Sequence, residues 1–89
     1  MKISEKKKEK ISEQILLILF QANPKMLFTS EIASEMARDE EFTKGLLSKL
    51  KKKGLVVEVN KNKEGTPYLR RTRWKISDKV YSAYKTALG

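Results

Sequence analysis

Hydrophobic residues recur at steps of three and four positions near the start of the chain. Ile11, Ile15 and Leu19 follow this spacing, while Lys and Glu fill most of the positions between them. This period predicts an amphipathic helix over residues 4–22, a stretch without Gly or Pro. Pro24 ends it, because the residue before a proline is pushed out of the helical region of backbone space.

The next thirty residues predict a short strand and two further helices. Residues 26–28 form an apolar run that is long enough for a one-strand stub. A helix is predicted over 30–37, since a hydroxyl precedes its apolar positions and an acid lies in its first turn. Another is predicted over 41–53, with apolar residues on one side, and Gly54 closes it with the residue type that accepts a left-handed backbone.

The C-terminal third predicts a β-hairpin followed by a helix. Residues 55–59 are β-branched and apolar, residues 60–67 have turn chemistry, and residues 68–76 form a second strand. Alternation along that strand places Trp74 and Ile76 on one face. We expect this face to be buried, which directs the residues of the opposite face to solvent: Arg71, Arg73 and Lys75.

The last predicted helix covers residues 78–88 and follows Ser77, which lies at the N-cap position. Its apolar stripe consists of Val80, Tyr81, Tyr84, Ala87 and Leu88. The whole pattern therefore predicts an α+β fold with a three-helix core, a two-stranded hairpin and a C-terminal helix.

Length and composition limit what such a fold can do. The 89 residues are 39% hydrophobic, which is enough for one modest core, so we expect a single domain over residues 1–89. With no Cys and no His, Cys/His zinc sites, thiol nucleophiles and Ser-His pairs are excluded. Only carboxylate or lysine chemistry remains, and no paired carboxylates in an apolar setting are evident, so we expect no enzyme, no catalytic residues, no metal and no cofactor. The sequence indicates no membrane segment, no signal peptide and no small-molecule pocket, and we expect a cytoplasmic protein.

Charge is the strongest functional indication. Lys and Arg number 20 against 11 Asp and Glu, a net charge of +9. Residues 44–53 and 61–75 together hold eleven Lys and Arg against Glu64 alone, whereas residues 31–41 are acidic. An excess this large and this local indicates a polyanionic partner.

Three segments between Phe28 and Asp78 resemble winged helix-turn-helix proteins. Residues 29–36, Thr-Ser-Glu-Ile-Ala-Ser-Glu-Met, resemble the first helix of that motif. Residues 47–56 are similar to the end of a recognition helix and the start of a wing, and residues 73–79 resemble the close of the wing. MarR-like and ArsR-like regulators, and small archaeal and viral winged-helix proteins, are the relatives that this order of segments resembles.

The resemblance implies double-stranded DNA binding, with the third helix in the major groove and a basic wing on the phosphate backbone. Carried onto this chain, the exposed face of the recognition helix consists of Thr43, Lys44, Ser48, Lys49 and Lys51. The wing contributes Lys61, Lys63, Arg70, Arg71 and Arg73. The sequence departs from the pattern where Asp39, Glu40 and Glu41 begin the recognition helix, since carboxylates there repel phosphates.

Other interpretations remain open at this level. The domain is alternatively a winged-helix module that binds a protein through its acidic segment, or a binder of RNA or single strands in which aromatic residues stack on bases. The N-terminal lysines belong either to a disordered basic arm or to the polar face of the first helix. We also expect a homodimer through the terminal helices, because Leu17, Ile18 and Phe20 lie off the first apolar stripe; the alternative is a first helix covered on two sides within one chain.

Overall fold

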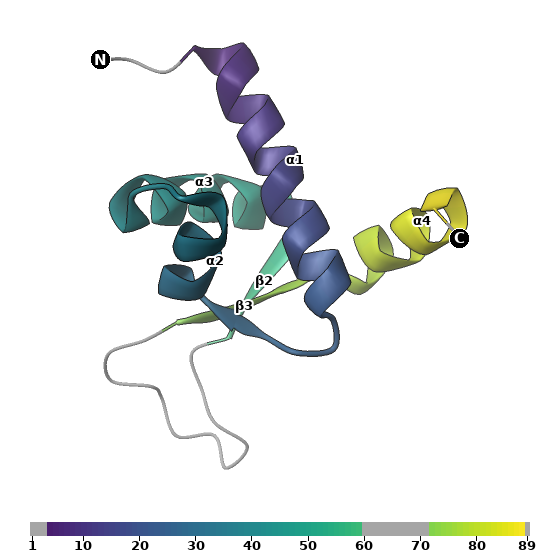
Figure 1. The fold of residues 1–89 in the computed structure, drawn as a ribbon. Coiled ribbons are helices and arrows are strands. Elements are labelled where there is room, and N and C mark those ends of the chain that lie inside the picture. The colour runs from purple at the N-terminus through teal and green to yellow at the C-terminus, as the bar shows by residue number, and fades with distance from the viewer. Residues whose placement is uncertain (1–3, 60–71, 89) are drawn as a thin grey trace.

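The computed structural model describes residues 4–59 and 72–88, and these form helices around a small sheet (Figure 1). The first helix, α1 (Glu5–Ala22), begins at Ser4, whose hydroxyl accepts a hydrogen bond from the amide of Lys7 at 3.2 Å. It ends at Asn23, directly before proline, as the sequence predicts. The lysines at positions 6, 7, 8 and 10 lie on this helix, so they belong to its polar face and not to a disordered arm.

A helix-turn-helix follows the first helix. A short strand, β1 (Leu27–Phe28), leads directly into α2 (Thr29–Met36), and α3 (Glu40–Lys52) comes after a tight turn. Ala37 makes that turn by adopting a left-handed backbone with φ 53°. Compared with the sequence prediction, both helices start and end one residue earlier.

The wing is built from β2 (Val56–Val59) and β3 (Arg73–Ile76). Gly54, at φ 75°, makes the turn from α3 into this hairpin, as its position predicts. The two strands pair antiparallel, with Val56 opposite Ile76, and β1 pairs with the other edge of β3, which gives the order β1-β3-β2. The predicted stub is thus a third strand of the sheet. The predicted loop and the first part of the predicted second strand, residues 60–71, lie outside the described residues.

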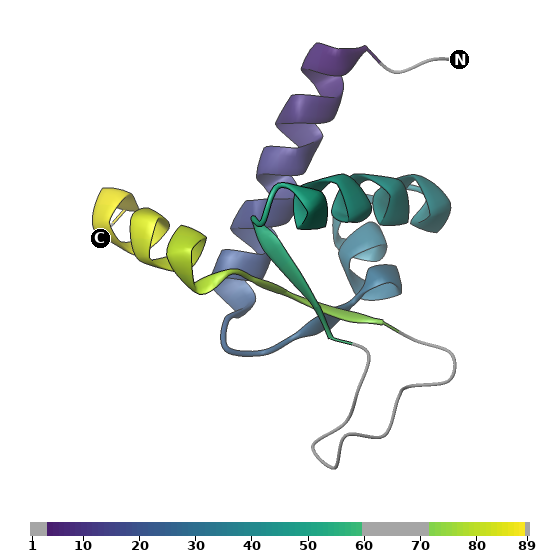
Figure 2. The same ribbon diagram turned by 180° about the vertical axis from the view of Figure 1, so that it is seen from behind.

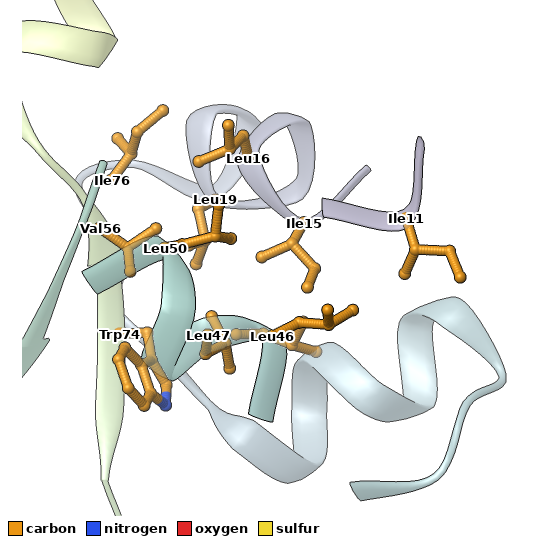
Figure 3. Packing of buried hydrophobic residues seen from close by; sticks show 11 residues of the cluster. Ile11, Ile15, Leu16, Leu19, Leu46, Leu47, Leu50, Val56, Trp74 and Ile76 are labelled. Atoms are coloured by element: carbon orange, nitrogen blue, oxygen red, sulfur yellow. The ribbon is translucent and has the colours of Figure 1, made fainter. Parts of the chain in front are cut away.

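One hydrophobic core joins α1, the helix-turn-helix and the sheet (Figure 3). Leu46, Leu47 and Leu50 of α3 face α1 from below, and Trp74 closes the end of the core nearest the sheet. The predicted core face of β3 is confirmed, since Trp74 and Ile76 are each 1% exposed. The remaining members of the cluster are Ile11, Ile15, Leu16, Leu19, Ile32 and Val56.

The last helix, α4 (Asp78–Leu88), lies on the opposite side of α1 from α3 in both views of the ribbon (Figures 1 and 2). The Ser77 hydroxyl accepts from the amide of Val80 at 3.3 Å, which confirms the predicted N-terminal end. Tyr81 and Tyr84 pack on the ring of Phe20, with centroid distances of 5.2 and 5.6 Å. The predicted apolar stripe is covered only along its first half, because Ala87 and Leu88 are exposed. No helix within residues 4–59 and 72–88 is long and apolar enough to cross a bilayer.

Candidate nucleic-acid interface

The exposed face of α3 is the first candidate surface. One side of this helix packs into the core through Leu46, Leu47 and Leu50, so the residues opposite them face solvent. Spacing along the helix places Glu41, Gly45, Ser48 and Lys52 at the centre of the outward side, with Lys44 and Lys49 beside them. All six are exposed. Lys44, Ser48 and Lys49 are thus exposed, as the sequence predicts, and Lys52, which the sequence did not place on the recognition face, is exposed beside them.

Thr43 is a correction to the predicted recognition face. Its side chain is fully buried, and its hydroxyl donates a 2.8 Å hydrogen bond to the backbone carbonyl of Asp39. The threonine lies three and four residues before Leu46 and Leu47, so it is on the same buried face of α3 as these leucines. Its hydroxyl is satisfied by its own helix, and burial there leaves no unpaired polar atom. Thr43 is unavailable to a groove.

Lys51 is exposed, but its ammonium group forms an ion pair within the chain. Its Nζ lies 2.7 Å from Oε1 of Glu58, and the two side chains are 52% and 27% exposed. The ion pair joins the last turn of α3 to strand β2 of the wing. The pair could not be predicted from the sequence, because α3 ends and the chain turns within the seven positions from Lys51 to Glu58, so helical spacing does not relate the two residues.

The acidic start of α3 has a structural cause. Asp39 is the N-cap residue, and its carboxylate accepts a hydrogen bond from the amide of Phe42 at 3.0 Å. Glu40 and Glu41 fill the first turn, where the helix dipole favours negative charge, and Lys49, Lys51 and Lys52 fill the last turn. The charge gradient along α3 therefore stabilises the helix itself. It also concentrates the cations in the C-terminal half, next to the wing.

The wing contributes one described arginine, and this residue is less accessible than predicted. Arg73 is half-buried, with its guanidinium carbon 4.8 Å above the centroid of the Phe28 ring, a cation–π contact between β3 and β1. The predicted exposure of Arg73 is corrected to that extent. Lys75, on the same side of β3, is also half-buried. The other predicted wing residues lie outside the described residues: Lys61, Lys63, Arg70 and Arg71.

Trp74 has a structural role and is not positioned to stack on a base. Its indole nitrogen donates a 2.8 Å hydrogen bond to the hydroxyl of Thr29, itself only 8% exposed. The bond joins β3 to the first turn of α2, so the wing and the helix-turn-helix share a buried polar contact. Across residues 4–59 and 72–88, no group of three acidic side chains converges in a way that would hold a metal ion.

This architecture matches solved structures of two bacterial proteins, MepR from S. aureus and ZitR from Lactococcus lactis. A MepR mutant aligns with a TM-score of 0.70 at 17% identity, over 86% of this chain and 53% of that one. A MepR–DNA complex aligns at 0.69 with 20% identity, over 88% and 62%. A ZitR mutant aligns at 0.70 with 17% identity, over 99% and 56%.

These alignments show that the chain has the α+β winged helix-turn-helix fold, and the residues that the structure describes form four helices and a three-stranded antiparallel sheet. The chain spans between half and two thirds of the length of the structures named above. No protein-family model matches the sequence, and no curated protein does.

Proposed function

We propose that this chain is a transcription regulator that binds double-stranded DNA, with α3 in the major groove and the hairpin of β2 and β3 on the adjacent backbone. The observation that carries the proposal is the outward face of α3, where the short residues Gly45 and Ser48 lie between Lys44, Lys49 and Lys52. A helix fits the major groove, and lysines at its flanks reach phosphates while short side chains let it approach the base edges.

The fold supports the same assignment. The chain aligns over 88% of its length with a MepR structure that contains DNA, and its described residues include a helix-turn-helix and the two strands β2 and β3. On the proposed wing, Lys61, Lys63, Arg70 and Arg71 supply phosphate contacts in addition to Arg73. Cations in the last turn of α3 and on the wing would then neutralise one continuous run of phosphates.

Within this interface the two elements have different tasks. Lys44 and Ser48, on α3, are the residues that we assign to sequence preference, because they lie on the face that meets base edges. The wing arginines are assigned to binding strength, since phosphate contacts are the same at every sequence. We assign no catalytic, metal-binding or cofactor-binding role to any residue.

The decisive experiment is a salt titration of binding to a mixed-sequence duplex, to single-stranded DNA and to RNA. We expect the duplex to bind most tightly. If about six to eight cations meet phosphates, log K should fall against log[salt] with a slope of about −5 to −7, because each contact releases roughly 0.9 counterion.

A matched pair of double variants locates the surface. Lys44→Gln/Lys49→Gln should flatten the slope by about two units, whereas Lys79→Gln/Lys85→Gln removes the same charge from α4, across α1 from the interface, and should change it by less than one. A slope shallower than about −2 contradicts the proposal. Tighter binding to RNA or single strands would identify that class of ligand instead, and no binding to any of the three would favour a protein-interaction module.

We also propose that the active form is a homodimer in which α1 and α4 of the two copies meet. Part of the apolar surface expected at the dimer contact is covered within one chain, since Phe20 packs on Tyr81 and Tyr84. A mostly apolar depression of about 350 Å³ remains between the two helices, and Glu13 lines it together with Leu17 and Leu88, which are 40% and 64% exposed. Two half-sites one helical turn apart would give a small module the specificity that one recognition helix lacks.

A further inference from the structure

Gly45 occupies a position where glycine is locally unfavourable. It is an interior residue of α3, with a full turn of helix on either side. In a helix interior glycine lowers stability relative to alanine more than any residue except proline, because it gives up the most backbone freedom on folding. Its presence therefore calls for a reason outside helix propensity.

The folded chain itself gives no such reason. A Cβ built on Gly45 meets nothing within 4 Å among the residues that the structure describes, so no close packing excludes a side chain. The backbone is ordinary right-handed helix, without the positive φ that requires glycine. Gly54 is the contrasting case, since its φ of 75° explains the glycine there completely.

The surroundings of Gly45 point to a partner that lies against the helix. Gly45 is at the centre of the outward face of α3, one turn from Glu41 and from Ser48. Lys44 and Lys49 flank this line, so the one position without a side chain lies between two exposed cations. A glycine in such a place lets another molecule approach the main chain more closely than any side chain would allow.

We propose that Gly45 is the point of closest approach between α3 and duplex DNA, and that its missing side chain is a requirement for binding. This rests on the proposed function above. The flanking lysines hold the phosphates on either side, and the helix backbone at Gly45 then lies against the groove floor. Any Cβ at this position would hold the helix away from base edges that Ser48 must reach.

The proposal makes stability and affinity respond in opposite directions to one substitution. Gly45→Ala should raise the melting temperature by about 3–8 °C, because alanine is the better helix former and its methyl group meets open space. The same methyl group should weaken duplex binding by about 5- to 100-fold, the range typical of one overpacked contact. Gly45→Gln should weaken binding further.

Ser82→Ala is the matched control. It also raises helix propensity at an exposed position, but it lies on α4, away from the proposed DNA surface. We expect this variant to gain stability without losing affinity. All four proteins are measured by thermal melting and by titration with the same duplex at one salt concentration.

The outcomes separate this inference from the function on which it rests. If the unsubstituted chain binds the duplex and Gly45→Ala binds it equally well or better, only the role of Gly45 is overturned. If the unsubstituted chain binds no duplex, both the proposed function and the role of Gly45 are overturned. A lower melting temperature for Gly45→Ala would show that the fold itself needs the glycine, and this would overturn the inference. An altered monomer–dimer equilibrium with unchanged DNA affinity would mean that Gly45 contacts a second copy of the chain, and this too would overturn it.

Discussion

The hydrogen bond from Trp74 to Thr29 joins the wing to the helix-turn-helix inside the core. Both side chains are buried, and they lie 45 positions apart in the sequence. An indole N–H that is buried without an acceptor carries its full desolvation cost, so the threonine hydroxyl allows the largest side chain of the core to be enclosed.

Thr29→Val should lower the free energy of unfolding by about 1–3 kcal/mol, since valine keeps the shape but leaves the indole N–H unsatisfied. Urea denaturation measures the loss. The same substitution in a Trp74→Phe background provides the control, because phenylalanine has no N–H to satisfy, and there it should cost much less. Equal costs in the two backgrounds would mean that the hydrogen bond does not contribute.

The sequence was a good guide to large side chains and a poor one to small polar ones. Trp74 and Ile76 were correctly expected in the core, because burying such apolar surface outweighs every other local effect. Thr43 was wrongly expected at the surface. Residue type alone favours exposure for threonine, and only the helical phase that it shares with Leu46 and Leu47, together with its bond to the carbonyl of Asp39, explains its burial.

At the scale of elements, local signals predicted which helices form and what ends them. Asn23-Pro24 ends α1 and Gly54 ends α3, because both act through the backbone of their own neighbourhood. The pairing of β1 with β3 was out of reach of such signals, since the two strands are brought together by the core and not by a turn. The same holds for the pair of Lys51 with Glu58, which depends on how α3 lies against β2.

That ion pair predicts a gain of affinity on removal of a carboxylate. In Glu58→Gln the ammonium of Lys51 no longer has a charged partner within the pair, and it becomes available to a phosphate. Duplex binding should tighten and the salt slope should steepen by about 0.9. The free energy of unfolding should change by less than about 1 kcal/mol, as is usual for exposed pairs.

Glu35→Gln is the control for the gain, because it removes the same charge from an exposed position on α2 that lines a depression with α1 and not with the lysines of α3. A second control adds Lys51→Gln to Glu58→Gln, which should abolish the gain. If Glu35→Gln tightens binding as much as Glu58→Gln, the effect is one of net charge and Lys51 is not a latent phosphate contact.

At the scale of the whole molecule, the fold separates two kinds of surface that the sequence interleaves. Cations gather on the outward face of α3, and exposed apolar groups gather where α1 meets α4. The helices α3 and α4 lie on opposite sides of α1 (Figures 1 and 2). Charge blocks along the chain predicted the first surface, because α3 is a continuous segment. The second surface brings together Leu17 and Leu88, which are far apart in the sequence, so only the three-dimensional arrangement defines it.

The apolar surface between α1 and α4 predicts self-association that can be disrupted without unfolding. Leu17→Glu and Leu88→Glu each place a carboxylate on the proposed dimer contact, and neither leucine belongs to the buried core. Tyr84 is a poorer choice, because it packs on Phe20 within its own chain. Burying an unpaired charge at an interface is costly enough that either variant should shift the equilibrium to monomer.

Sedimentation equilibrium at micromolar concentration measures this equilibrium. The unsubstituted chain should sediment at about twice 10.3 kDa, the two variants near 10.3 kDa, and all three should keep the same melting temperature at concentrations where they are monomeric. Ser34→Glu adds the same charge at an exposed position of α2 that does not line the depression between α1 and α4, and it should leave the dimer intact. A 10.3 kDa species for the unsubstituted chain at every concentration would reject the dimer, and each copy would then bind DNA through one recognition helix and one wing.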